Sequence, residues 1–319
     1  MQPGFERGAT MEAVAGAVGA DLHVHTAASD GLLTPPQVVE RAAALGLAAI
    51  AVADHDTTAG VVPARVRGAE MGLQVVPAVE INTEVDRCEV HILGYWMSHL
   101  DRLETALGRL RRARQGRART ILHRLAGLGI SLDWERVLEL AQGGVLGRPH
   151  IARAMVEQGY AQSVMDAFEN YLLPGRPAYV PRYRLTPAEA IALVRQAGGA
   201  AVLAHPATGP SDAFIRELVA CGLQGLEVYH PSHGPEHVVH YLRLAGEHDL
   251  VVTGGSDFHG PGEREGSDIG SYTVGLDAVV KLEIKARAGL DGTSQAYPSM
   301  AGDIYTGRER RKGVRDDLR

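Results

Sequence analysis

Short apolar runs alternate with amphipathic helical stretches along most of the chain from residue 20 onward. Strands are predicted at seven of these runs, which cover residues 20–26, 47–53, 73–81, 89–95, 200–204, 223–229 and 250–253. Thr34-Pro35-Pro36 predicts a helix start, because threonine caps helix N-termini and proline fits the first turn. Thr186-Pro187 repeats this signal. Repeated strand–helix units indicate a parallel sheet, and this many units without a glycine-rich dinucleotide motif favour a barrel.

The pattern changes between residues 97 and 185, where helical periodicity replaces the strand–helix alternation. This segment holds eight arginines between Asp101 and Arg124, and we interpret it as a helical subdomain inserted into the barrel. The barrel is then built from residues 20–96 and 186–275. Residues 276–319 shift in composition and end in dense charge, and they are interpreted as a peripheral C-terminal tail.

Composition and charge narrow the class of protein. Of the 319 residues, 45% are hydrophobic and 22% charged, which is enough to bury a core and argues against disorder. A net charge of −6 excludes a globally basic coat for nucleic acid. No apolar run approaches the roughly 18–20 residues of a membrane helix, and no signal peptide is recognisable. We therefore expect a cytoplasmic protein that does not bind membranes.

Histidines and carboxylates gather where the predicted strands end. His23 and His25 are two residues apart on the first strand, so both point to one face. Nine residues of this kind lie at a strand end or in the loop beyond it: His23, His25, Asp30, His55, Glu80, His91, His205, Asp257 and His259. The carboxyl ends of barrel strands converge on one mouth, where active sites form. Imidazoles mixed with carboxylates and no thiolates favour Mn, Fe or Zn over Mg or Ca.

Six motifs in this order resemble the PHP (polymerase and histidinol phosphatase) family. They are Asp21-Leu-His-Val-His-Thr, Ala53-Asp-His-Asp, Glu80, His91, Ala204-His-Pro and Gly255-Ser-Asp-Phe-His. The resemblance implies an α/β fold, a distorted (β/α)7 barrel, with three divalent metal ions, Mn²⁺ favoured and Zn²⁺ or Fe²⁺ as alternatives. It assigns His23, His25, Glu80 and Asp257 to one metal, Glu80, His91 and His205 to a second, and Asp30, His55 and His259 to a third.

The helical insertion and the run Gly147-Arg-Pro-His-Ile-Ala-Arg resemble the nucleotide-processing branch of this family. Members of that branch remove the 3′-phosphate from nucleoside 3′,5′-bisphosphates, and some trim RNA from its 5′ end. The resemblance implies that Arg148 and Arg176 bind phosphate, since a guanidinium fork matches two phosphate oxygens. His230 is expected to contact phosphate or protonate the leaving oxygen, and His233 is a further candidate for substrate binding.

We therefore expect a phosphoesterase in which a metal-bridged hydroxide attacks phosphorus while Arg148 neutralises phosphoryl charge. The expected substrate is a nucleoside 3′,5′-bisphosphate, with short 5′-phosphorylated RNA as a related one and no obligate protein partner. Histidinol phosphate and cyclic phosphodiesters are alternative substrates. A non-catalytic, nucleic-acid-binding barrel is a remote alternative, because the ligand set is complete. The arginine-rich stretch 101–124 lacks interleaved aromatic residues, so we interpret it as a solvated face and not as an RNA-stacking platform.

Overall fold

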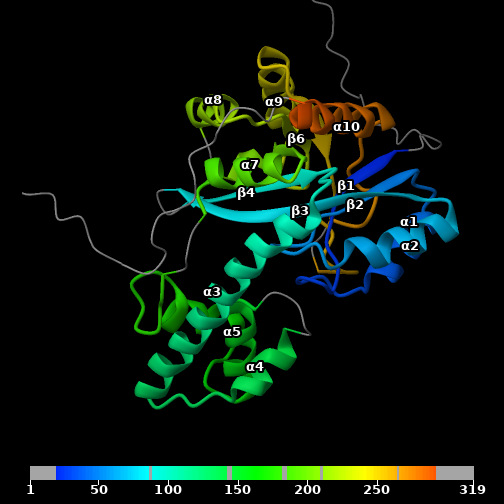
Figure 1. The fold of residues 1–319 in the computed structure, drawn as a ribbon. Coiled ribbons are helices and arrows are strands. Elements are labelled where there is room, and N and C mark those ends of the chain that lie inside the picture. The colour runs from blue at the N-terminus through cyan, green and yellow to red at the C-terminus, as the bar shows by residue number, and fades with distance from the viewer. Residues whose placement is uncertain are drawn as a thin grey trace, which may run out of the picture.

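A seven-stranded sheet forms the centre of the protein and curls into a nearly closed barrel (Figure 1). The computed structural model describes residues 19–85, 88–141, 146–181, 185–208, 211–263 and 266–291. The strands follow chain order around the sheet and are β1 (Ala20–Val24), β2 (Ala49–Val52), β3 (Gln74–Val85), β4 (Cys88–Tyr95), β5 (Ala200–Leu203), β6 (Gly225–Tyr229) and β7 (Val251–Gly254). A bridge between Val24 and Phe258 brings the segment after β7 back to β1.

The strand β4 departs from a wholly parallel barrel. It pairs antiparallel with both β3 and β5, whereas the other neighbouring strands pair parallel. Only residues 86–87 separate β3 from β4, and a parallel connection needs a dozen residues or more. The expectation of a parallel sheet is therefore wrong at β4, while the distorted (β/α)7 barrel is confirmed.

Helices cover the outside of the barrel. They are α1 (Pro35–Ala44), α2 (Val61–Met71), α7 (Pro187–Gln196), α8 (Asp212–Ala220) and α9 (Pro235–Glu247). Two of them, α1 and α7, begin where Thr34 and Thr186 predict a helix start, and these threonines are the N-cap residues. Thr186 Oγ1 accepts a hydrogen bond from the Glu189 amide, and the Glu189 carboxylate accepts one from the Thr186 amide. These reciprocal bonds satisfy donors that the first turn of a helix leaves open.

A further helix, α10 (Leu276–Asp291), packs at the end of the barrel where the parallel strands begin. Its buried residues Ala278, Leu282 and Ala286 are four positions apart, as one face of a helix requires, and join the cluster of interior strand residues. The charged tail expected from residue 276 therefore starts later, because this helix belongs to the barrel. Charged side chains between the buried positions concealed the apolar spacing. Residues 292–319 lie outside the described residues.

The described residues between β4 and α7 form a helical segment on one side of the barrel (Figure 1). Its elements are α3 (Leu100–Gly127), α4 (Trp134–Leu140), α5 (Arg148–Glu157), α6 (Val164–Ala167) and a π-helical turn (Phe168–Leu172). α3 contributes Leu103 and Leu107 to the barrel core and Ile121 and Leu125 to a separate apolar cluster within the segment. One long helix therefore joins two cores. No described helix has both the length and the hydropathy to cross a bilayer.

We predict that the first of these contacts stabilises the barrel. Leu107 is fully buried, so Leu107→Ala should lower the free energy of unfolding by about 2–5 kcal/mol through lost apolar contact and a residual cavity. Leu128, at the other end of α3, is 48% exposed, and Leu128→Ala should cost less than about 0.5 kcal/mol. Urea denaturation checks both values. Equal costs for the two variants would show that α3 is not anchored through Leu107.

Candidate metal centre

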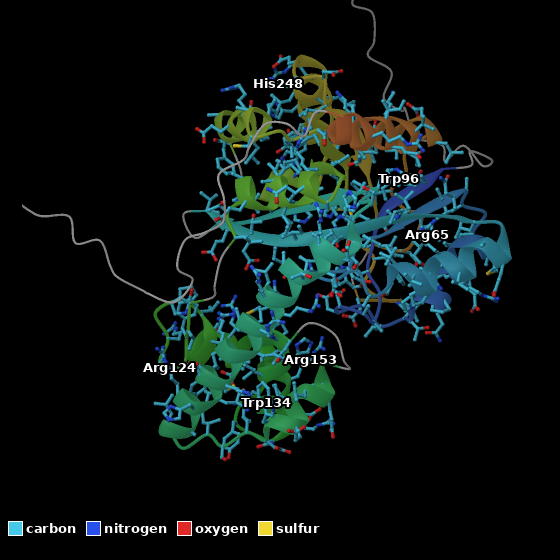
Figure 2. The ribbon with its side chains drawn as sticks, in the orientation of Figure 1. Arg65, Trp96, Arg124, Trp134, Arg153 and His248 are labelled. Atoms are coloured by element: carbon cyan, nitrogen blue, oxygen red, sulfur yellow. The ribbon has the colours of Figure 1, made fainter. Side chains whose placement is uncertain are left out.

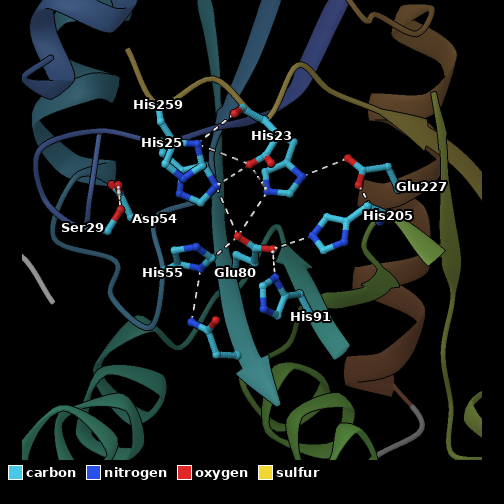
Figure 3. A network of polar contacts seen from close by, with 12 residues as sticks. His23, His25, Ser29, Asp54, His55, Glu80, His91, His205, Glu227 and His259 are labelled. Carbon is cyan, nitrogen blue, oxygen red and sulfur yellow. Dashed lines mark hydrogen bonds and ion pairs between the residues drawn. The ribbon is translucent and has the colours of Figure 1, made fainter. Parts of the chain in front are cut away.

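One buried carboxylate, Glu80, lies at the centre of the histidine cluster (Figure 3). It is 1% exposed and belongs to the interior of β3, which continues to Val85, so it is not at a strand end as expected. Its two oxygens lie 2.7–3.3 Å from ring nitrogens of five histidines, which are His23, His25, His55, His91 and His205. A single carboxylate is thus in contact with groups from β1, from β4 and from the segments that follow β1, β2 and β5.

The ends of the strands bring these groups inward. His55 follows β2 and bridges to Glu80 through the backbone, and His91 lies opposite Asn82 across the antiparallel pair β3–β4. His205 after β5 and Asp257 after β7 have positive φ values of 26° and 51°. Non-glycine residues adopt this conformation at a cost of about 1–3 kcal/mol, and such residues concentrate at functional sites. The chain therefore turns sharply at two of the positions where a ligand is expected.

All nine residues predicted as metal ligands lie in this one cluster. Four groups within it have ligand atoms less than 4.8 Å apart: His25–Asp30–His55–His259, His23–His25–Glu80, His55–Glu80–His91 and His23–His230–Asp257. The groups differ from the expected sets, because His25 lies with the Asp30 group as well. His230 joins Asp257, with Nε2 3.5 Å from its carboxylate, so this histidine is closer to the ligands than the sequence indicated.

Buried polar atoms of the cluster fit divalent metal ions. Among the described residues, six of the buried side-chain atoms without a hydrogen-bond partner belong to it: His23 Nε2, His25 Nδ1, His25 Nε2, Glu80 Oε2, His91 Nε2 and His230 Nε2. Some of these atoms meet in ion pairs, such as Glu80 Oε2 and His25 Nε2 at 3.2 Å, and coordination of a cation would satisfy the lone pairs that these contacts leave open. Imidazole nitrogens with carboxylate oxygens are the ligands that Mn²⁺, Fe²⁺ and Zn²⁺ accept. The residues therefore fit the group that the family resemblance implies.

Opposite charges shift the protonation of the metal-free cluster strongly. Burial lowers the pKa of His25, but Asp257, Glu80 and Asp30 outweigh burial and raise this pKa to about 10. Burial likewise opposes ionisation of Glu80, yet the neighbouring imidazoles, His55 foremost, hold its pKa well below the usual range. Without metal, a protonated His25 thus lies beside an ionised Glu80 at about pH 7.

Glu227 on β6 is a positioning residue that the sequence analysis did not identify. It is fully buried, its carboxylate lies 3.0 Å from Nδ1 of His23, and it accepts a hydrogen bond of 2.8 Å from the amide of His205 (Figure 3). A carboxylate behind a ligating imidazole fixes the ring's orientation and tautomer. The available signal was a carboxylate in the middle of an apolar strand, which is costly to bury without a partner.

Asp54 supports the Asp30 side of the cluster in a similar way. Its carboxylate accepts hydrogen bonds of 2.6–2.8 Å from Thr26 and Ser29, in the turn that leads to Asp30. Asp54 precedes His55 in the motif Ala53-Asp-His-Asp, but only His55 was predicted as a metal ligand. Its burial at 1% exposure shows that it acts inside the protein and not at the surface.

A cleft of about 360 Å³ opens beside the cluster, between the barrel and the helical segment. Asp30, His55 and His259 line its barrel side. The opposite wall carries the basic side chains of Arg114, Arg117, Arg148, His150 and Arg153, which lie among apolar residues such as Ile121 and Phe168. Figure 2 labels Arg153 on the helical segment. Two arginines of the stretch interpreted as a solvated face therefore line the cleft, and this part of the interpretation is wrong. The position of these two arginines depends on the direction in which α3 leaves the barrel, and no local sequence motif indicates that direction.

Of the three predicted substrate-binding residues outside the cluster, only Arg148 lines the cleft. Its guanidinium also donates a hydrogen bond to the carbonyl of Leu172. Arg176 is exposed in the turn after the π-helical segment and is not among the residues that line the cleft. His233 lies behind His230, where Nδ1 is 2.8 Å from the Val228 carbonyl and Nε2 is 3.5 Å from the Ala207 amide. Both ring nitrogens of His233 thus contact backbone, which is typical of a structural histidine.

Comparison with known proteins gives a consistent result. A model of the PHP domain family matches residues 21–172. The 5′-3′ exoribonuclease Rnm of Salmonella typhimurium is 38% identical over 252 residues, which are 76% of this chain and 85% of that protein. The 3′,5′-nucleoside bisphosphate phosphatase of Chromobacterium violaceum is 34% identical over 277 residues, or 84% of this chain and 96% of that protein.

A further relative and a solved structure are also similar to this chain. The phosphoribosyl 1,2-cyclic phosphate 1,2-diphosphodiesterase of Eggerthella lenta is 36% identical over 249 residues, covering 75% of this chain and 94% of that protein. A crystal structure from Bifidobacterium adolescentis, of a protein provisionally called a metal-dependent phosphoesterase, superposes with a TM-score of 0.74 at 35% identity. That alignment covers 84% of this chain and 96% of the other.

We predict that metal binding releases protons from the cluster. The pKa of His25 is raised to about 10, so the ring is protonated at about pH 7, whereas a ligating imidazole must be neutral. The apparent affinity for Mn²⁺ should therefore rise with pH between about 6 and 8. Calorimetric titration of chelator-treated protein in two buffers of different ionisation enthalpy measures the proton count. A binding enthalpy that is the same in both buffers would contradict the prediction.

A second prediction concerns Glu227. Glu227→Gln keeps the size of the side chain but removes the charge that orients His23, so metal affinity should fall by about 10–100-fold. Glu217→Gln on the exposed face of α8 is the matched control and should leave affinity unchanged. The metal retained after dialysis against a graded chelator series measures both. If Glu227→Gln retained as much metal as the wild-type protein, Glu227 would have no role in orienting His23 for metal binding.

Proposed function

The chain belongs to the PHP domain family, and from this premise we propose that it is a metal-dependent phosphoesterase. Its proposed reaction is removal of the 3′-phosphate from nucleoside 3′,5′-bisphosphates. The observation that carries the proposal is the cleft, which joins a histidine–carboxylate cluster to a basic wall. A substrate with two phosphate groups needs one site for the reacting phosphate and fixed positive charge for the remaining anion. The Chromobacterium relative named as a 3′,5′-nucleoside bisphosphate phosphatase supports this choice.

The proposed metal ligands are the nine residues of the cluster. Three divalent ions are proposed, with Mn²⁺ favoured, held by His23, His25, Asp30, His55, Glu80, His91, His205, Asp257 and His259. When bound, the metals supply a water of lowered pKa and positive charge beside the phosphoryl oxygens. Glu80 touches five of the imidazoles, and Glu227 holds two of the histidine positions from behind. The chain thus fixes ligand geometry before substrate arrives.

Two side chains are proposed to act on the substrate. Arg148 lines the cleft and would pair its guanidinium with phosphate oxygens, which stabilises the charge that they carry during transfer. His230 is buried at the edge of the cluster, with Nδ1 2.8 Å from the Ser232 hydroxyl and Nε2 3.5 Å from Asp257. We propose that it delivers a proton from Nε2 to the leaving oxygen.

The proposed domain boundaries follow the sequence, except at the C-terminus. Residues 20–96 and 186–275, extended by α10, form the phosphoesterase barrel, and residues 97–185 form an inserted subdomain that supplies the basic wall. Short 5′-phosphorylated RNA is a second candidate substrate, supported by the relative named as an exoribonuclease and by the several cations of the cleft. Location in the cytoplasm stays a prediction.

Product analysis tests the proposal. Mn²⁺-loaded protein incubated with adenosine 3′,5′-bisphosphate should release inorganic phosphate and 5′-AMP. Glu80→Ala and Asp257→Ala should lower kcat/KM by about 10³-fold or more and reduce the bound metal, because each removes a proposed ligand. Glu236→Ala, exposed on α9, is the control and should behave as wild type.

The alternatives predict other outcomes in the same assay. Faster turnover of histidinol phosphate, or of a cyclic phosphodiester as the Eggerthella relative's name suggests, would reassign the substrate. Full activity with normal metal content in either ligand variant would overturn the metal-dependent mechanism.

A further inference from the structure

The third residue of α5, His150, lies in the cleft but has no role in the function proposed so far. It is 6% exposed and lines the cleft together with Asp30, His55 and His259 on the facing side. The negative charge of Asp30, on the facing wall, acts to raise the pKa of His150. His150 is thus an imidazole that the helical segment contributes to the cleft, beside the arginines of the same wall.

One hydrogen bond fixes how this imidazole is protonated. Nδ1 of His150 lies 3.0 Å from the amide of Gly147 and accepts its hydrogen. A neutral imidazole carries its single hydrogen on the nitrogen that does not accept. Burial lowers the pKa of His150, and Arg153 lowers it further, so the ring is neutral at about pH 7. The hydrogen is therefore on Nε2.

We propose that His150 is a substrate-binding residue that donates a hydrogen bond from Nε2 to an oxygen of the phosphate held at the metal cluster. The inference rests on the proposed function for its substrate class. The Gly147 bond holds the ring in one orientation, so little side-chain freedom is lost when phosphate binds. Arg148 and Arg153 on the same wall supply charge, whereas His150 supplies a fixed, neutral and directional donor.

A purely structural role for His150 is the competing explanation, and the chain contains its own comparison. A side chain at the third helical position that bonds back to the residue before the helix is a capping interaction. His237 makes the same bond in α9, where its Nδ1 accepts from the amide of Gly234 at 3.2 Å. His237 does not line the cleft. The two histidines therefore share the capping contact and differ in access to substrate.

The test uses the substitutions His150→Gln and His237→Gln in the full chain. Glutamine at this helical position can still accept the bond from the preceding amide, so capping is retained while the imidazole donor is lost. In metal-loaded protein, His150→Gln should weaken binding of inorganic phosphate and raise KM for adenosine 3′,5′-bisphosphate, each by roughly tenfold or more, as expected for a lost hydrogen bond to a charged group. His237→Gln should leave both values unchanged. Metal content and Tm of both variants should match wild type.

The outcomes separate this inference from the proposed function. If wild-type protein does not cleave adenosine 3′,5′-bisphosphate but binds phosphate in a manner that depends on His150, the substrate assignment fails and the His150 inference stands. Wild-type phosphate affinity in His150→Gln would overturn the inference whatever the substrate is. His150→Glu provides a second variant, because it keeps the capping acceptor but places a negative charge in the cleft. His150→Glu should lose phosphate binding while its Tm stays at the wild-type value. If His150→Gln and His150→Glu lose phosphate binding only because both are unfolded, as a lowered Tm would show, the inference is overturned as well.

Discussion

The burial of the Glu80 carboxylate is the constraint on which the rest of the site depends. An isolated ionised carboxylate in a protein interior is penalised by several kcal/mol, so it needs compensating charge and hydrogen bonds. Five imidazoles, from β1, β4 and the segments after β1, β2 and β5, provide the contacts. In the metal-free protein His23, His25 and His55, whose pKa values are raised, compensate the charge by holding protons, and divalent cations would compensate it in their place. Protons and metals therefore compete for one set of atoms, and the barrel must close for that set to assemble.

The irregular features of the barrel follow from this assembly. A wholly parallel sheet would present only strand ends to the mouth of the barrel. Because β4 is antiparallel, its His91 lies opposite Asn82, a residue in the interior of β3 that is two positions after Glu80. Small interior side chains such as Ala51 and Ala78 belong to the apolar cluster inside the barrel, and α10 packs on the same cluster where the parallel strands begin. Positive φ at His205 and Asp257 turns the chain inward. Among the described residues, five non-glycine residues have positive φ; two of them, His205 and Asp257, are proposed metal ligands, and a third, Asp56, adjoins His55.

The sequence was informative where a residue's position is costly unless it has a function. Histidines such as His23 and His25 within apolar strands indicate a site, because burial without partners is unfavourable, and this reasoning found the whole cluster. It failed for Glu227, whose partner comes from a strand about 200 residues away in the chain. It also failed for cleft residues such as Arg114 and His150, because their place depends on the path of α3. Arg176 shows the opposite error, because it was predicted to bind phosphate but is exposed outside the cleft. An arginine beside a proline–glycine turn has no local feature that distinguishes a phosphate-binding side chain from a solvent-exposed one.

The helical segment contacts the proposed metal ligands through the turn after β2, which contains His55 and Asp56. Arg111 on α3 donates a hydrogen bond of 2.8 Å to the carbonyl of Asp56, and Arg114 pairs with the buried Asp56 carboxylate. The same carboxylate accepts a hydrogen bond of 3.0 Å from the amide of Asn82, whose side chain contacts His55 at 3.2 Å. Removing one partner of a buried ion pair is costly because the other charge is left uncompensated. Displacement of α3 would therefore disturb His55 as well as the basic wall. The segment that lines the substrate cleft thus also helps to hold a proposed metal ligand, which couples the geometry of the two.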